Sequence, residues 1–472
     1  MENKENGFEW KGIKMEDLRQ IMDDPADNAV KSIFEKQDMG YLTGLLKNMA
    51  ENDDVVSVEL PEAMQKFADN IHKFKFSEKD IQCFVQTHKI WEKHGMKFIF
   101  ILFFRALPYT YRAEKPANVL RMTKLLITHA ERRIFETAQF VFDVMDENWW
   151  EPKKKGILTA TKVRIMHAAM RHVILDNNKS DEQWNSVWGK PISQEDLIAT
   201  NQVFSLEFFK GLEILGEGLK PKEQEAWFHT WKTIGKIMGV QDNLISKNVK
   251  EAWSLQHVIY DHLFSDESHS GVMLAKALVE TMSTFHLPTK LTLILMRRML
   301  ADKQFPDSFE KMLGPSYKDE YPELFEVHTT SEDKEEHEER LRGHYHSELK
   351  DYYQKLNEEK KTIIKKGIEN KENNPAVHKG LFEKIIDFLM NLVGISKKEQ
   401  HLIDVHIELL HNVLHHKDTG NPLEELEEEM ILDSMTAMGG IMIAILNGHF
   451  RKGKDTGFRI PATLQDNWQL KG

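Results

Sequence analysis

The residues best suited to chemistry lie in the segment KVRIMHAAMR, which runs from Lys162 to Arg171. If this segment is helical, Arg164, His167 and Arg171 lie along one face, because side chains three and four residues apart are neighbours on a helix. An imidazole among apolar side chains, with a cation one turn away on each side, suits a ligand to the iron of a haem whose propionates or acidic neighbours pair with arginine. From the pattern alone, however, a histidine on an apolar face is more often a hydrogen-bonded core residue. The apolar stripe beside this face consists of Val163, Met166, Met170 and Ile174.

A second group of polar residues lies upstream in the segment THAERRIFETAQFVFDVM. On a helix, Arg133, Glu136 and Thr137 share one face, and neighbouring phenylalanines and valines supply apolar surface. A guanidinium, a carboxylate and a hydroxyl arranged in this way can line the open side of a cofactor pocket. The alternative is a solvated helix face that carries one weak ion pair.

Composition excludes several classes of protein. The 472 residues include 63 Lys plus Arg and 75 Asp plus Glu, and the resulting formal charge of -12 is of the wrong sign for binding nucleic-acid phosphates. Cys83 is the only cysteine, so the chain cannot form an internal disulfide, a CxxC zinc site, a thiolate-held iron–sulfur cluster or a CxxCH haem attachment. Any haem is therefore expected to be haem b, held non-covalently. The sequence MENKENGFEWKG lacks the features of a secretory signal, which predicts a cytoplasmic protein.

Two apolar runs need to be checked as possible membrane segments. The run FIFILFF, from Phe98 to Phe104, is too short to cross a bilayer, and the run from Met430 to Leu446 contains Asp433. Buried core helices are the favoured interpretation of both, so membrane association is not expected. A C-terminal anchor stays an alternative for the second run, because basic residues follow it closely.

The elements that must position these residues are predicted to be helices. Apolar residues recur with a period of 3.6 along much of the chain, and alternating strand-like runs are scarce, so we predict an all-α fold. Capping signals mark several helix starts, among them Ser77 with Asp80 and Ser193 with Asp196. The strongly charged stretch after Ser331 indicates a boundary. We expect four segments: an N-terminal helical extension (1–94), a catalytic domain (95–320), a charged helical linker (321–372) and a C-terminal helical extension (373–472).

Six motifs in order give the chain a resemblance to a known family. They are RALPYTYR, RRIFETAQF, KVRIMHAAMRH, WGKPISQEDLIATNQVFS, WKTIGKIMGV and RRMLADKQFPDSFEKMLGP, and they cover about residues 95 to 316. This order resembles the haem-dependent oxygenase family of the latex-clearing proteins (rubber oxygenases) and the MpaB-like oxygenases. The resemblance implies a multi-helical, haem-binding domain with a globin-like core and added N- and C-terminal helices.

The resemblance also implies roles for individual residues. The family pattern R-x-x-H-x-x-x-R falls on Arg164, His167 and Arg171, which makes His167 the proximal iron ligand, and the family's distal Arg and Thr fall on Arg133 and Thr137. This sequence departs from the family at two positions. Glu136 stands where the latex-clearing proteins carry a lysine, and Ser193 stands where Asn is expected.

The function implied by the resemblance is oxidation of an apolar, unsaturated or isoprenoid substrate by dioxygen. In this scheme Arg133 and Thr137 orient the oxygen, and Glu136 accepts a proton from the substrate. Two alternatives stay open: a haem-binding sensor or carrier without turnover, in which Glu136 blocks or ligates the distal position, and a helical interaction protein of the same fold without haem. A further sequence pattern, the ExxH from Glu408 to His411, has no second copy with which to build a di-iron site.

Overall fold

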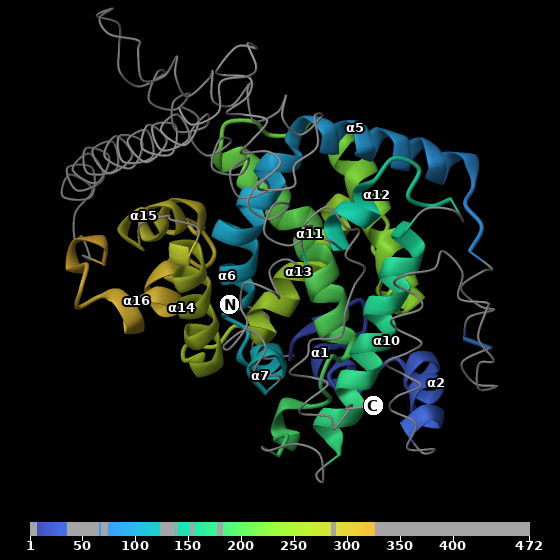
Figure 1. Ribbon diagram of the computed structural model, residues 1–472, viewed down its shortest axis with the longest axis horizontal. Helices are drawn as coiled ribbons and strands as arrows, with labels where there is room; N and C mark the ends of the chain where they lie inside the picture. The colour runs from blue at the N-terminus through green and yellow to red at the C-terminus, as the bar shows by residue number, and fades with distance from the viewer. Residues whose placement is uncertain are drawn as a thin grey trace, which may run out of the picture. The chain divides into compact units, whose positions relative to one another are not determined.

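The computed structural model describes residues 7–34, 66–67, 74–122, 137, 140–151, 155–176, 183–284 and 289–325. Within these residues the chain is mostly helical, which confirms the predicted all-α class (Figure 1). Arg133, Glu136 and the ExxH sequence at Glu408 fall outside them, as do nearly all of the predicted linker and the whole C-terminal extension. The four-segment division of the chain stays a prediction.

Two compact units divide the chain, and the boundary between them falls after Ala277, inside helix α14 (His269–Thr284). The described part of the second unit contains the rest of α14, α15 (Thr289–Met299), α16 (Ser308–Tyr317) and the short 3-10 helix η6 (Pro322–Leu324). In this unit the rings of Phe309 and Phe325 stack at 4.8 Å between centroids.

The first unit contains the other described elements, which begin with a two-stranded antiparallel hairpin. Lys11 and Gly12 form its turn, and both have positive φ, as a two-residue hairpin turn of type I′ requires. The elements are β1 (Glu9–Trp10), β2 (Ile13–Lys14), α1 (Met15–Leu18), α2 (Asp24–Phe34), α5 (Glu78–Ile101), η3 (Leu102–Ala106), α6 (Leu107–Thr110), α7 (Glu114–Met122), α10 (Lys155–Leu175), η4 (Ser186–Trp188), α11 (Gln194–Ile214), α12 (Pro221–Ile237), η5 (Asp242–Leu244) and α13 (Val249–Leu263).

Local sequence signals explain where the principal helices begin and end. Capping boxes start α5 at Ser77 and α11 at Ser193, as predicted, and in each case the aspartate three residues later completes the box. Helix α12 starts with Pro221, whose fixed φ and missing N–H suit the first helical position. It is followed by Gly239, whose φ of 97° is typical of a residue just past a helix end.

The apolar run from Phe98 to Phe104 forms the end of α5 and the start of η3, a π-helical turn. All seven of its residues are buried, which confirms the prediction of a core helix for this run. In the part of the chain that the structure describes, no helix is both long enough and apolar enough to cross a membrane. The second apolar run, from Met430, lies outside the described residues.

Helix α11 lies at the centre of the first unit, where it packs against α5, α12 and α13. Most of its side chains are buried on every face, as expected for a helix that is surrounded by others. The contact with α12 includes Phe204 and Trp231, whose rings stack at 4.6 Å between centroids. Stacked aromatic rings of this kind stabilise the folded protein by more than the burial of their apolar surface alone.

Ion pairs join α10 to α2 and to Asp23, the residue that precedes α2, and the two helices lie side by side in Figure 1. Arg164 binds the carboxylate of Asp23 with two nitrogens, at 2.6 and 2.7 Å. About two helical turns further along α10, Arg171 donates from Nε to Oδ1 of Asp27 at 2.7 Å. Gly239 leaves room for the first pair, because a Cβ atom there would collide with the Asp23 carboxylate and the Arg164 guanidinium.

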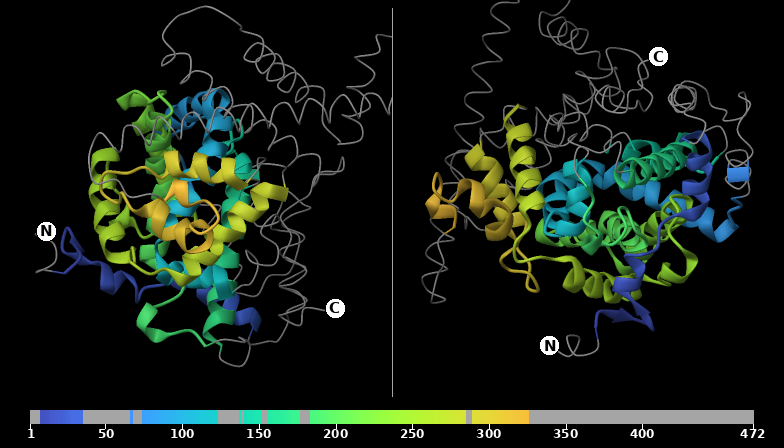
Figure 2. Two further views of the ribbon diagram at one scale, coloured as in Figure 1. Left: turned by 90° about the vertical axis from the view of Figure 1, so that its left-hand side faces the viewer. Right: turned by 90° about the horizontal axis from the view of Figure 1, so that it is seen from below.

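Arg19 connects the N-terminal segment to the start of α11. Its side chain is fully buried and donates to the carbonyl of Trp188 at 2.6 and 3.0 Å and to Ser193 Oγ at 3.1 Å. It also forms an ion pair with Asp196. The guanidinium therefore neutralises a buried carboxylate and holds the capping box that starts α11. Figure 2 shows the dark blue N-terminal segment along the outside of the first unit.

The first prediction concerns this buried cation. Substitution of Arg19 by Met removes the charge but keeps much of the side-chain volume, and it leaves Asp196 buried without its charged partner. Breaking a buried pair from one side typically costs about 3–5 kcal/mol, so we expect a loss of that size in the free energy of unfolding, measured by urea denaturation. The matched control is Lys14→Met, because Lys14 is exposed and the change should stay within about 0.5 kcal/mol. Equal stability of the two variants would contradict this role of Arg19.

Candidate functional site

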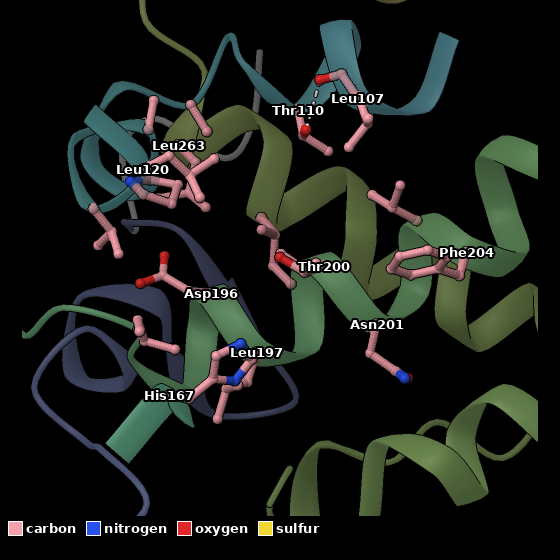
Figure 3. Close-up of a pocket in the computed structure, with 18 of the residues that line it drawn as sticks. Leu107, Thr110, Leu120, His167, Asp196, Leu197, Thr200, Asn201, Phe204 and Leu263 are labelled. Carbon is pink, nitrogen blue, oxygen red and sulfur yellow. Dashed lines mark hydrogen bonds between the residues drawn. The ribbon is translucent and has the colours of Figure 1, made fainter. Parts of the chain in front are cut away.

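A cavity of about 300 Å³ lies inside the first unit, among α6, α7, α10, α11 and α13 (Figure 3). Apolar and aromatic side chains form most of its wall. A volume of this size falls at the lower end of the range for small-molecule sites, and an apolar wall with a few polar groups is typical of them.

Helix α10 contributes Val163, Met166, His167 and Met170 to the wall. Val163 and Met170 each lie three or four residues from both Met166 and His167, so these side chains share one face of the helix. His167 is partly exposed and projects into the cavity close to Leu197 of α11 (Figure 3). The structure therefore places the histidine of the sequence motif beside an internal space.

The two arginines of the motif lie elsewhere. Arg164 pairs with Asp23, just before α2, and Arg171 pairs with Asp27 of α2, as described above. Arg171 also donates to the carbonyl of Ile192 at 3.2 Å. Acidic neighbours are thus the observed partners of both cations, and their role in holding a cofactor stays a prediction.

Of the predicted distal residues, Thr137 is described, and it lines the same cavity as His167. Arg133 and Glu136 lie outside the described residues. The structure therefore brings together one residue from each of the two sequence constellations, which are thirty residues apart in the chain. Phe140, one turn after Thr137, also borders the cavity.

Helix α11 forms a second wall, which includes Asp196, Thr200 and Asn201. The carboxylate of Asp196 is bound by Arg19 and by the backbone N–H of Ser193 at 3.0 Å. Asn201 donates from its amide to the carbonyl of Trp231 at 2.9 Å. Thr200 is exposed although it belongs to a central helix, and Figure 3 shows it near the middle of the view.

Helix α13 adds Gln256 and Tyr260 to the wall. The Tyr260 hydroxyl donates to Oε1 of Glu207 at 2.8 Å, and the other oxygen of Glu207 lies 2.7 Å from Nη2 of Arg105. Burial, followed by the charge of Glu207, raises the pKa of Tyr260 well above its usual value, so the phenol stays protonated. Sequence reasoning missed Thr200, Gln256 and Tyr260, because such residue types carry no spacing signal when they lie on helices with a mainly apolar pattern.

A second buried polar group lies next to the cavity wall. Glu195 is fully buried and lies 2.6 Å from Nδ1 of His262, whose Nε2 is 3.0 Å from the exposed Glu16. Burial raises the pKa of Glu195, although His262 and Arg19 oppose that shift. This chain of contacts connects α11, α13 and the N-terminal segment.

His167 is the motif residue at this cavity whose imidazole could ligate a metal ion. Within the described ranges, no group of three or more His, Cys, Asp or Glu side chains is placed to hold a metal ion.

Comparison with known proteins identifies similar sequences and folds. Residues 91–329 match the family described as ER-bound oxygenase mpaB/B'/Rubber oxygenase, catalytic domain. A rubber oxygenase from Streptomyces sp. (strain K30) is 24% identical over 237 residues, which are 48% of this chain and 56% of that protein. The match thus spans little more than half the length of that relative. The structure of latex clearing protein LCP in the closed state has a similar fold, with a TM-score of 0.54 and 19% identity over 71% of this chain and 92% of that chain.

The second prediction tests whether the cavity accepts ligands. Substitution of Thr200 by Phe should fill part of the space without unfolding the protein, because the side chain faces open volume. We expect the affinity for a neutral apolar fluorescent dye, N-phenyl-1-naphthylamine, to fall about tenfold or more, while the melting temperature changes little. Glu213→Phe on the outer surface of the same helix is the control. Undiminished dye binding by the Thr200 variant would show that the dye does not enter this cavity.

Proposed function

Because the chain belongs to the family described as ER-bound oxygenase mpaB/B'/Rubber oxygenase, catalytic domain, we propose that it is a haem b-dependent oxygenase. Its substrates are dioxygen and an apolar, unsaturated compound of the isoprenoid class. The observation that carries this proposal is the projection of His167 into an internal, mainly apolar cavity.

The residues around His167 fit a haem. Val163 and Met170 lie one turn away on each side of the histidine and offer apolar surface for a flat, hydrophobic ring system. The imidazole of His167 would supply one ligand to the iron, which is the contribution that a haem takes from proteins of the globin and peroxidase type. When bound, the haem supplies the binding and activation of dioxygen.

The arginines of the motif support this arrangement from positions one turn before and one turn after His167 on α10. Arg164 and Arg171 hold the helix against α2, so the face that carries His167 is directed to the cavity. We propose that they contribute to cofactor binding in this indirect way. A histidine held in one orientation loses less conformational freedom when it binds a metal.

The distal roles come from the family resemblance. We propose that Arg133 and Thr137 donate hydrogen bonds to dioxygen, and the position of Thr137 in the cavity wall supports this assignment. Glu136, the neighbour of Thr137 in sequence, accepts a proton from a carbon of the substrate through its carboxylate. An apolar wall favours this chemistry, because it excludes water and raises the basicity of a carboxylate.

The third prediction tests the iron ligand. His167→Ala should fold but retain little haem, because the axial bond is lost, and the absorbance of the Soret band relative to protein concentration measures the loss. His172→Ala, on the same helix but outside the cavity wall, is the control and should bind haem fully. His167→Gly should recover haem binding when imidazole is added, since the free base can occupy the vacated position. Full haem retention by His167→Ala would rule out His167 as the ligand.

The fourth prediction tests the proposed base. Glu136→Gln keeps the size and hydrogen-bonding capacity of the side chain but removes its basicity, so oxygen consumption with an unsaturated isoprenoid should slow by about 100- to 10,000-fold. Haem content should not change. Glu147→Gln, an exposed position nearby in sequence, is the control. A normal rate in Glu136→Gln excludes this base, and no oxygen uptake by the haem-loaded parent with a panel of unsaturated lipids would favour a sensor or carrier.

A further inference from the structure

We propose that the substrate carries a neutral hydroxyl group on its unsaturated apolar chain, and that Gln256 and Thr200 bind this hydroxyl. The inference rests on the proposed function, because it concerns the substrate of the same cavity. It separates this chain from a protein that acts on a pure hydrocarbon.

Gln256 provides the first observation. Its side chain is fully buried and borders the cavity, and its Nε2 donates to the carbonyl of Ala199 over a long distance of 3.4 Å. Within the described part of the chain, its Oε1 has no hydrogen-bond partner. Since buried polar atoms are nearly always paired in native proteins, an unpaired oxygen on a cavity wall indicates that a ligand supplies the missing donor.

Thr200 provides the second group. It follows Ala199, the residue that accepts the hydrogen bond from Gln256, so the amide and Thr200 belong to the same part of the wall. The side chain of Thr200 is exposed and borders the cavity. A hydroxyl group on a ligand can donate to Gln256 Oε1 and accept from Thr200 Oγ1, which uses both of its hydrogen-bonding functions.

The charges around the cavity restrict the polar group further. Among the described lining residues there is a carboxylate, Asp196, but no lysine or arginine. Glu207 lies directly behind Tyr260, where its charge is matched by Arg105. A carboxylate or phosphate bound at Thr200 and Gln256 would meet no cation among these described residues, which is unfavourable. An alcohol is neutral and avoids this cost.

These features predict discrimination against hydrocarbons. A hydrocarbon in the cavity would offer neither Gln256 nor Thr200 a hydrogen-bond partner and would leave both groups unpaired. A site that hydrogen-bonds the hydroxyl group of its substrate strongly rejects an analogue that lacks this hydroxyl. An apolar site rejects a ligand that carries an additional hydroxyl group much less strongly. Selectivity for the alcohol should therefore depend on Gln256.

The test compares farnesol with farnesene, which has a similar unsaturated chain without the hydroxyl group. Binding to the full chain is measured by isothermal titration calorimetry and by the fluorescence of tryptophan, because Trp231 borders the cavity. We expect farnesol to bind about tenfold more tightly than farnesene, which corresponds to about 1.4 kcal/mol. Farnesyl phosphate should bind more weakly than farnesol. Equal affinity for farnesol and farnesene, or preference for the phosphate, would overturn the proposal.

Two variants test whether Gln256 and Thr200 cause the preference for farnesol. Gln256→Leu and Thr200→Val should each reduce the preference for farnesol severalfold, and farnesene should bind no more weakly than to the parent. Gln202→Leu is the matched control, because Gln202 is also buried with an unpaired Oε1 but does not border the cavity, and its preference should stay that of the parent. Retention of the full preference in Gln256→Leu would overturn the proposal.

A haem titration of the same variants separates this inference from the proposed function. The comparison of farnesol with farnesene is made with haem-free and haem-loaded protein, so it gives a result even if the chain binds no haem. We expect Gln256→Leu to take up haem like the parent. If its haem uptake falls while the preference for farnesol is unchanged, Gln256 faces the cofactor and the assignment to the substrate is wrong.

Discussion

The ion pairs of Arg164 with Asp23 and of Arg171 with Asp27 determine how α10 is rotated about its axis. Apolar residues are spread around most of this helix, so hydrophobic burial alone would tolerate several rotations. Two guanidinium groups seven residues apart remove that freedom, because turning the helix would bury them away from their carboxylates. The cavity-facing position of His167 follows from this constraint.

The start of α11 is held by a comparable interaction. Arg19 lies in the N-terminal segment but neutralises Asp196, whose side chain both caps the helix and borders the cavity. Helix α11 then supplies Thr200 to the cavity wall and stacks Phe204 on Trp231. Segments far apart in the chain therefore position the site, and the charged residues nearest the cavity are satisfied by the protein itself.

A cavity of this kind combines two requirements. The apolar side chains beside His167 suit a hydrophobic cofactor and an unsaturated chain, whereas the group formed by Thr200, Gln256 and Tyr260 offers hydrogen bonds without net charge. Membership of the oxygenase family limits the chemistry but not the substrate, because substrate choice depends on the few polar groups in the wall. The described residues that line the cavity can form hydrogen bonds with one neutral polar group of a ligand.

The sequence by itself determined the features that depend on neighbouring residues. Periodicity predicted the all-α class, Ser77 and Ser193 with their following aspartates predicted helix starts, and six ordered motifs identified the family and pointed to His167. Tertiary structure alone decided the partners of Arg164 and Arg171, which lie 141 and 144 residues away, and the gathering of Thr200 and Gln256 at one cavity. A helical pattern shows which residues share a face of one helix, but the contents of a cavity depend on how separate helices pack together.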